Sequence, residues 1–532
     1  MKAARKQYES GTKAAWKRSG IGAGMFGSVI ERKTEQEDCV MEQMEQYDVV
    51  VIGGGPGGLA AAAAACESGA GRVAVLERDG RAGGILNQCI HDGFGIVRYG
   101  LQLSGPEYAE RECGRAVQAG AAVQTGEAVL EISSDRIVTA LGPNGLRRIR
   151  AGAVVLATGC RERTRGALSI PGTRPAGIFT AGTAQNLINL QNVMIGRRIV
   201  ILGSGDIGLI MARRLTLEGA EVLGAAEIMD EPQGLARNVS QCLDDFGIPL
   251  HLGRTVSNIF GRHRLEAVEI SRVDENRRII AGSGRIIPCD TLVLSVGLIP
   301  ENEVAETAGV SLDRRTNGAL TDRFLQTSVP GIFACGNARA VMDLADFVSE
   351  QGELAGANAA RYTLGEALQP WQKNPHNAAR KGMPEQGSIT CTLCPRGCQV
   401  QIRADGTVTG NGCPKGAELA RQEREEPRRI LTTTMRISAA DSRLLPVRSD
   451  RPVPLREMRR IAAELRETTV AEALAGHTAG QGAAAPGEPA VAPGEPAAAP
   501  GEPAAAPERI RTGAVIVPGV YGDIGMIAER PL

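Results

Sequence analysis

The sequence predicts an α/β protein with two doubly wound units and a small β-rich domain that carries a cysteine cluster. Three observations support this fold class. Residues 49–52 form a short β-branched run that leads into a glycine-rich turn and an alanine-rich segment, and the same order returns at residues 198–208. Buried parallel strands read as continuous apolar runs of this kind. In addition, four of the 12 cysteines gather between residues 391 and 413.

The first glycine-rich turn has the G-x-G-x-x-G spacing of a dinucleotide-binding loop. Its glycines allow a tight turn, a close approach of a pyrophosphate, and close packing of a helix on a strand. The helix that follows would present its free N–H groups to that pyrophosphate. The next strand ends at an acidic residue, which is suited to hold a ribose hydroxyl. The expected contacts are Gly53, Gly55, Pro56, Gly57, Gly58, Glu77, Arg78, Gly83 and Gly84.

A second unit repeats this order, and its last glycine and its acid, Gly208 and Glu227, have the same spacing as Gly58 and Glu77. The repeat predicts two dinucleotides, or a duplication in which one site has been lost. No arginine adjoins Glu227, which favours NAD over NADP because a 2′-phosphate would be repelled by the carboxylate. The expected contacts in this unit are Gly203, Gly205, Asp206, Ile207, Gly208, Glu227 and Gly297.

Residues 153–159, A-V-V-L-A-T-G, and the strand–glycine segment at 327–338 flank the second unit. This order resembles the pyridine nucleotide–disulfide oxidoreductase superfamily over residues 47 to about 365. The resemblance implies an FAD domain interrupted by an NAD domain, with an amide at Asn337 in place of the acid that bonds the flavin ribityl chain. Further FAD contacts implied by the resemblance are Ala128, Ala157, Thr158, Gly159, Gly336 and Asn337.

Disulfide reductases of that superfamily carry two cysteines four residues apart in the loop after the first acid. This sequence has Cys89 alone, which excludes a dithiol relay at that place. Alignment of the motif puts Cys89 and His91 near the flavin edge. They are candidate catalytic residues, as a proton donor or a thiolate partner of the flavin, and the alternative is a role in packing or flavin positioning.

The four clustered cysteines, Cys391, Cys394, Cys398 and Cys413, have the spacing C-x2-C-x3-C-x14-C. Three close thiolates and one that returns from a hairpin favour a [4Fe–4S] cluster. A zinc site is the alternative, although zinc usually shows two C-x2–4-C knuckles, and free thiols are a third interpretation. The motif looks like the iron–sulfur segment of molybdopterin oxidoreductases. Residues 388 to about 470 resemble a small cysteine-rich family of unknown function.

The predicted organisation follows from these motifs and from shifts in composition. Residues 483–507 repeat Pro-Gly-Glu-Pro and predict a polyproline-like spacer. The predicted parts are a disordered extension (1–46), an FAD-binding part (47–165), an NAD-binding domain (166–290), a second FAD-binding part (291–365), a linker (366–387), the cysteine-rich domain (388–475), the spacer (476–510), and a final strand of that domain (511–532).

Composition restricts the class of partner. The 60 basic and 60 acidic residues cancel, so neither nucleic acid nor a charged membrane is indicated. No stretch reaches the roughly 18–20 apolar residues of a transmembrane helix, and no secretory signal is seen. The other eight cysteines are scattered singly, which is typical of a reducing compartment. A cytoplasmic location is therefore expected.

Residues 160–185 closely match reductase subunits of glycerol-3-phosphate, proline and cyanide-forming amine dehydrogenases. The leading hypothesis is that NAD(H), as the nucleotide substrate, exchanges hydride with FAD, and that the flavin exchanges single electrons with the cluster. By this resemblance the partner is a glycerol-3-phosphate dehydrogenase-like flavoprotein. Two alternatives are a non-catalytic assembly component with a structural nucleotide and zinc, and a stand-alone NADH-dependent reductase.

Overall fold

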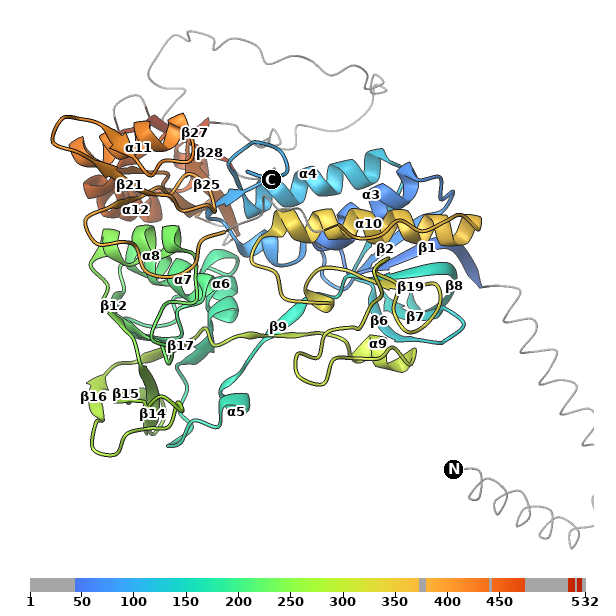
Figure 1. The fold of residues 1–532 in the computed structure, drawn as a ribbon, viewed down its shortest axis with the longest axis horizontal. Helices are drawn as coiled ribbons and strands as arrows, with labels where there is room; N and C mark the ends of the chain where they lie inside the picture. The colour runs from blue at the N-terminus through green and yellow to red at the C-terminus, as the bar shows by residue number, and fades with distance from the viewer. Residues whose placement is uncertain (1–43, 373–378, 440–442, 474–514, 522–523, 529–532) are drawn as a thin grey trace, which may run out of the picture.

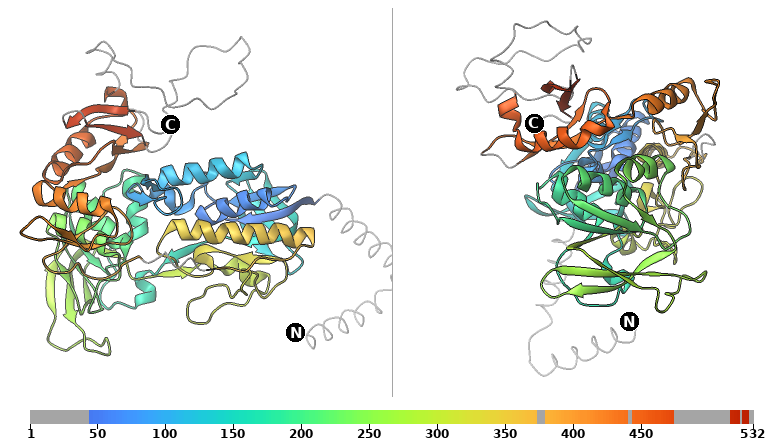
Figure 2. Two further views of the ribbon diagram at one scale, coloured as in Figure 1. Left: turned by 45° about the horizontal axis from the view of Figure 1, so that its top comes forward. Right: turned by 90° about the vertical axis from the view of Figure 1, so that its left-hand side faces the viewer.

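The computed structural model describes residues 44–372, 379–439, 443–473, 515–521 and 524–528. The expectations for most of the N-terminal extension and for the spacer therefore lie outside the described residues. The described chain forms two α/β units joined by a narrow connection, and a smaller unit lies beside the second one (Figures 1 and 2). None of the helices in the described part of the chain combines the length and the apolar character that a bilayer crossing requires.

The first unit is built on one sheet with the order β5-β2-β1-β8-β7-β6, and β19 also pairs with β8. Strands β1, β2, β5 and β19 run parallel to β8, whereas β7 is antiparallel to it. Because β19 follows the whole second unit in the chain, the first domain is interrupted, as predicted. The strands are β1 (Glu45–Ile52), β2 (Val73–Glu77), β5 (Ala122–Thr125), β6 (Ala128–Ile132), β7 (Ile137–Gly142), β8 (Gly145–Leu156) and β19 (Ile332–Ala334).

Alternate residues of β1 enter two different cores. Val49 and Val51 pack under the helices of one face, whereas Val50 and Ile52 face a second core on the other side. This two-sided burial explains the uninterrupted apolar run in the sequence. The covering helices are α3 (Pro56–Glu67), α4 (Gly105–Gln118) and α10 (Ala345–Leu364) on the first face and α9 (Glu303–Thr307) on the second.

Helices α3 and α10 approach each other backbone to backbone. A Cβ atom added to Gly352 would overlap the carbonyl oxygen of Gly57, and one added to Gly356 would overlap that of Ala61. The two helices therefore contact through a stripe of small residues. This close crossing holds the glycine-rich turn before α3 against the start of α10.

The second unit has a parallel sheet with the order β10-β17-β11-β12-β13. Ile199 and Ile201 face the helices, and Val200 and Leu202 face a three-stranded antiparallel sheet. The elements are β10 (Ile178–Thr180), α6 (Ala181–Asn189), β11 (Arg198–Leu202), α7 (Asp206–Leu217), β12 (Glu221–Ala226), α8 (Ala236–Cys242), β13 (Leu250–His251), β14 (Arg254–Gly261), β15 (Leu265–Arg272), β16 (Arg285–Pro288) and β17 (Thr291–Leu294).

The two sheets are connected by two chain segments that pair with each other. Strand β9 (Cys160–Glu162) leaves the first sheet, and β18 (Leu298–Pro300) returns to it, and the two form an antiparallel pair. Figure 1 shows this pair as the narrow connection between the units. Helix α5 (Arg165–Leu168) follows β9 at the edge of the second unit.

The smaller unit contains a cysteine-bearing hairpin and a separate four-stranded sheet. The sheet has the order β24-β25-β28-β27, so the chain returns to pair β28 with β25 after the residues outside the description. The elements are β20 (Ile389–Thr390), β21 (Gln399–Ile402), β22 (Val408–Thr409), α11 (Pro414–Glu425), β23 (Arg428–Arg429), β24 (Thr432–Arg436), β25 (Leu444–Ser449), β26 (Val453–Pro454), α12 (Met458–Glu467), β27 (Val515–Tyr521) and β28 (Ile524–Ala528).

The smaller unit contacts both larger units through arginine side chains. Arg429, only 6% exposed, donates from two guanidinium nitrogens to Asp245 at 2.7 and 2.9 Å. Arg448 pairs with Glu107 at the start of α4. Leu217 at the end of α7 is part of the small unit's core. Charge-assisted bonds around a shared apolar core fix the orientation of this unit.

The helix crossing yields a matched pair of substitutions. Gly352→Ala should destabilise the protein by about 2–3 kcal/mol, because the added methyl group overpacks a backbone contact. Gly114→Ala, on the open side of α4 with no atom within 4 Å of the new methyl, should stabilise it by about 0.5–1 kcal/mol. Urea unfolding of both variants measures the difference, and equal stability of the two would contradict the proposed crossing.

Candidate functional site

A cavity of about 1640 Å³ lies where the three units meet. Typical sites for one small ligand are roughly 300–1,000 Å³, so this cavity is large enough for more than one. Most of the residues predicted to bind FAD line it, whereas Gly58 and Gly83 do not. The predicted FAD residues in the wall are Gly53, Gly55, Pro56, Gly57, Glu77, Arg78, Gly84, Ala128, Ala157, Thr158, Gly159, Gly336 and Asn337.

Both glycine-rich turns have the same backbone conformation. Gly53 and Gly203 each have a φ of +99°, which an L-residue rarely adopts. A Cβ on Gly53 would lie 2.5 Å from the carbonyl oxygen of Ala157, and a Cβ on Gly203 would overlap the carbonyl of Ser295 in the same way. Only glycine therefore fits, and the turns leave a cradle free of side chains for a diphosphate.

The two acids also occupy equivalent places but differ in access. Glu77 accepts hydrogen bonds from the N–H groups of Gly54 and Asp79 at 2.7 and 2.9 Å, and its side chain lines the cavity. Glu227 accepts bonds from Ser204 N–H, Ser204 O–H and Met229 N–H at 2.9, 2.6 and 3.0 Å. The two acids are equally buried, at 5% exposed for Glu77 and 4% for Glu227, but only Glu77 is among the residues that line the cavity.

The second cradle opens to the cavity only at its front. Gly205, Asp206, Ile207 and Gly297 line the cavity, whereas Gly203, Gly208 and Glu227 do not. The turn at residues 233–235 is held beside this cradle, because Gln233 N–H donates to Ser204 Oγ and Leu235 N–H donates to Asp206 Oδ1, and both Gln233 and Leu235 line the cavity. Burial raises the pKa of Asp206, and its bonds from Asn238 and Leu235 oppose that rise.

Cys89 and His91 lie together in the cavity wall. The Cys89 thiol donates to Gln185 Oε1 at 3.6 Å, and burial raises its pKa to about 12. Burial, with a smaller contribution from the charges of Arg237 and Arg213, lowers the pKa of His91 to about 4, and Asp92 opposes this shift. At neutral pH the thiol is therefore protonated and the imidazole is neutral, which does not favour the thiolate role.

The loop that carries these two residues is held at both ends. Before it, Gln88 donates to Gly182 O and Gln185 Oε1 on α6, at 2.9 and 3.0 Å. After it, Asp346 at the start of α10 accepts from the N–H groups of Gly95 and Val97 at 2.9 and 2.8 Å. The loop thus spans the first and second units in one conformation.

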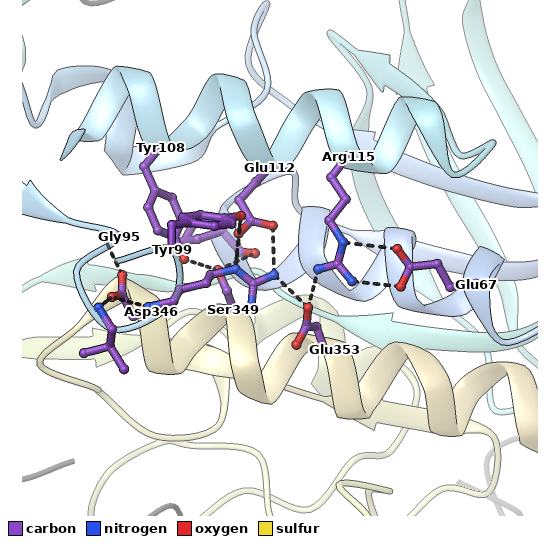
Figure 3. A network of polar contacts seen from close by, with 12 residues as sticks. Glu67, Gly95, Tyr99, Tyr108, Glu112, Arg115, Asp346, Ser349 and Glu353 are labelled. Carbon is purple, nitrogen blue, oxygen red and sulfur yellow. Dashed lines mark hydrogen bonds and ion pairs between the residues drawn. The ribbon is translucent and has the colours of Figure 1, made fainter. Parts of the chain in front are cut away.

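A network of ion pairs supports the second attachment (Figure 3). Arg98 donates to Glu112 at 2.5 Å and to Glu353 at 2.7 Å, and Tyr99 donates to Glu112 at 2.5 Å. The Glu112 side chain is fully buried, and Arg115 extends the network from Glu353 to Glu67. A buried carboxylate with two donors is stable only while both partners remain, so the network rigidifies the loop.

Asn337 lines the cavity, but its amide is already engaged. Its Oδ1 accepts from Met342 N–H at 2.9 Å, and its Nδ2 donates to Cys160 Sγ at 3.4 Å. The amide therefore holds the turn after β19 in shape. Its second N–H hydrogen is the group left to bond a ribityl hydroxyl, where an acid would accept a bond instead.

The four cysteines of the small unit lie near one another. Cys391 N–H donates to Cys398 O at 2.8 Å, which closes the loop between them. Burial raises the pKa of the Cys391 thiol, and the nearby thiols of Cys394, Cys398 and Cys413 raise it further. Within the described ranges, however, no three His, Cys, Asp or Glu side chains converge as a single bound ion requires.

The cysteine loop forms part of the cavity rim. Pro395, which follows Cys394, lines the cavity together with both cradles. Arg380 N–H donates to Pro395 O at 3.1 Å, and Ala236 N–H donates to Arg380 O at 2.9 Å. Through these bonds the loop is fixed to the start of α8. The sequence motifs predicted the cysteine cluster but not its position beside the nucleotide sites.

Several cavity residues have no motif that would have identified them. Gln88 and Asp346 line the cavity and hold the loop around Cys89, with Gln185 bonded to Gln88 behind the wall, and Arg237 on α8 also lines the cavity. Each lies on an element whose local sequence looks ordinary. The only available signal was a polar residue at a position that the helical pattern would bury.

Two Rossmann-like sheets, the first interrupted by the second, with paired cradles define a two-domain flavoprotein. The family described as "Pyridine nucleotide-disulphide oxidoreductase" matches residues 47–360, more than half of the chain. The chain belongs to this family and is an FAD/NAD(P)-dependent oxidoreductase. A second description, "Protein of unknown function (DUF1667)", matches residues 414–477. This match begins directly after Cys413. The expected resemblance began at residue 388, so the match confirms it for α11 to α12 but does not include the cysteine loop.

The chain is 27% identical over 342 residues to one of the subunits of opine oxidase from Agrobacterium tumefaciens (strain Ach5), which covers 60% of this chain and 65% of that protein. It is 30% identical over 226 residues to the ferredoxin reductase component of chlorobenzene dioxygenase from Cupriavidus sp. (strain PS12), covering 40% and 51%. The chain thus spans less than two thirds of either relative.

Two solved structures are similar at the level of the fold. Thioredoxin reductase of T. acidophilum has 23% identity and a TM-score of 0.49, and the match covers 60% of this chain and 99% of that one. L-proline dehydrogenase from P. horikoshii has 22% identity and a TM-score of 0.43, with 62% and 58% covered.

The difference between the two acids gives a test of the first cradle. Glu77→Gln should lower FAD affinity about tenfold or more, because the carboxylate faces the cavity and hydrogen bonds to charged groups are the strong ones. Glu227→Gln should leave FAD affinity unchanged, since this acid lies in the second sheet. FAD titration of the two apoproteins by fluorescence provides the comparison, and an equal loss in both would contradict the assignment.

Proposed function

We propose that this chain is the electron-transfer component of a dehydrogenase complex. In this proposal NAD(H) and FAD occupy the two cradles, and Cys391, Cys394, Cys398 and Cys413 hold a [4Fe–4S] cluster. When bound, FAD and NAD(H) supply hydride exchange, and the cluster supplies single-electron transfer. The proposal assigns to the chain's own residues the tasks of holding these groups side by side and excluding water between them.

One observation carries the proposal: the cysteine loop and both cradles share one cavity wall. A zinc-binding module that served only to attach a partner would have no reason to lie on the rim of a nucleotide cavity. The bonds from Ala236 through Arg380 to Pro395 make this position specific rather than a loose contact. A redox group at the cysteines would therefore lie behind the part of the cavity wall that Pro395 forms.

The residues present suit FAD and NAD(H). The turns at Gly53 and Gly203 form cradles that a Cβ would fill, and Glu77 offers a carboxylate to the first cavity end. The preference for NAD rests on the acid at position 227 and on the lack of a neighbouring arginine in the sequence. Glu227 does not line the cavity. In this proposal its charge acts on the nucleotide from a distance, or the 233–235 turn moves and exposes it.

The donor set also suits an iron–sulfur cluster. Four thiols interact electrostatically around Cys391, yet the described residues do not converge on a single ion. Zinc requires four sulfurs at about 2.3 Å from one point, whereas a cubane separates its thiolate ligands more widely and tolerates a more open loop. The preference for the cluster over the zinc alternative, in which the chain would be a non-catalytic assembly component, rests on the C-x2-C-x3-C-x14-C spacing of the sequence.

The proposed partner is based on the names of two relatives and on the resemblance of residues 160–185. One relative is named as a subunit of opine oxidase, and another is named as the ferredoxin reductase component of chlorobenzene dioxygenase. Residues 160–185 resemble reductase subunits paired with glycerol-3-phosphate-type dehydrogenases, which makes such a flavoprotein the proposed partner in the cytoplasm. A stand-alone disulfide reductase is disfavoured, because the sequence has no closely spaced cysteine pair in the FAD and NAD domains.

The decisive experiment is anaerobic purification followed by metal analysis and absorption spectroscopy. The proposal expects about four iron atoms per chain, a flavin spectrum over broad visible absorbance, and loss of both absorbances on addition of NADH. Cys394→Ser should lose the iron but keep the flavin, whereas Cys113→Ser on α4 should keep both. Zinc without iron, or a flavin that NADH does not reduce, would overturn the proposal in favour of the assembly component.

A further inference from the structure

Arg237 is a buried cation that forms no ion pair with the described residues, although the Asp206 carboxyl lies near it. Its side chain is 6% exposed, yet its Nε has no hydrogen-bond acceptor, and no carboxylate of the described residues forms an ion pair with its guanidinium. Burying a charge is unfavourable unless it is paired and hydrogen-bonded. The incomplete pairing of Arg237 leaves its guanidinium able to bind an anionic group.

The guanidinium of Arg237 lies in the cavity wall beside Gly93. Arg237 lines the cavity, and its Nη2 lies so close to Gly93 that a Cβ on that residue would overlap it. Gly93 has a φ of +112°, which favours glycine at this position and leaves room for the guanidinium. His91 is neutral and offers no negative charge. The neighbouring Arg213 already donates to Ile430 O at 2.7 Å, which leaves Arg237 as the unsatisfied cation of this pair.

The position of Arg237 identifies the anion. Asn238, the next residue, donates to Asp206 Oδ1 at 2.7 Å, and Asp206 is the first residue of α7. The charge of Arg237 also lowers the pKa of Asp206, so the two groups lie near each other. Gly205, Asp206 and Ile207 face the cavity beside it. A helix N-terminus and an arginine side by side are the two features that bind phosphate groups most often.

We propose that Arg237 binds the diphosphate of the nicotinamide dinucleotide at the front of the second cradle. The guanidinium would supply the positive charge that the partly blocked turn and the carboxylate of Asp206 do not. This inference deepens the proposed function and depends on its NAD(H) site. It also assigns a task to Gly93: to leave room for the arginine between the Cys89 loop and the second unit.

The test uses the FAD-loaded protein and ADP-ribose, which carries the diphosphate but no nicotinamide. Arg237→Gln should weaken ADP-ribose binding about tenfold or more in calorimetry, while Arg237→Lys should recover part of the affinity. Arg174→Gln is the matched control. Arg174 is an exposed residue in the wall of the same cavity. Its substitution removes the same positive charge but leaves the buried guanidinium of Arg237 in place.

The outcomes separate this inference from the function on which it rests. A wild-type protein that binds neither ADP-ribose nor NADH would overturn the nicotinamide site itself. Wild-type binding that persists unchanged in Arg237→Gln, or that falls equally in Arg174→Gln, would overturn the role of Arg237 alone. Loss of FAD from Arg237→Gln with ADP-ribose affinity retained would assign the guanidinium to the flavin and would also overturn it. The FAD content and the melting temperature of each variant show that it has folded.

Discussion

The contact between the cysteine loop and the start of α8 is the constraint on which the functional account depends. It consists of two backbone hydrogen bonds, from Ala236 to Arg380 and from Arg380 to Pro395. Backbone bonds tolerate little sliding, so they fix the loop against the cavity rim. The arginine contacts of the small unit, Arg429 to Asp245 and Arg448 to Glu107, hold the rest of that unit in register with both larger units.

The titratable groups of the cavity wall are of more than one kind. The two on the Cys89 loop are neutral, whereas others, such as Arg78 and Glu301, are held in an ion pair. The Cys89 thiol is protonated and the His91 imidazole is neutral because burial disfavours their charged forms. Glu77 keeps its carboxylate with two N–H donors, and the Nε of Arg237 has no acceptor. The protein wall thus contributes sites for hydroxyls at one end and for an anion at the other.

The sequence predicted the architecture well because its signals are local. Glycines at 53 and 203 must adopt a positive φ, and an apolar strand before each turn is enough to place both sheets. The interruption of the first domain followed from the strand at residues 332–334. The access of Glu227 to the cavity was not predictable, because the 233–235 turn beside the second cradle depends on a hydrogen bond to Ser204. Arg237 was missed for the same reason: its significance arises from Gly93, which is far away in the chain.

The central claim is that the cysteine site and the flavin exchange electrons within one chain. A rapid-mixing experiment under anaerobic conditions tests it directly, by following flavin absorbance and broad visible absorbance after NADH is added to the oxidised protein. The account predicts that the second absorbance falls after the first, at a rate that does not change when the protein is diluted. A rate proportional to protein concentration, or a cysteine site that stays oxidised while the flavin is reduced, would contradict it.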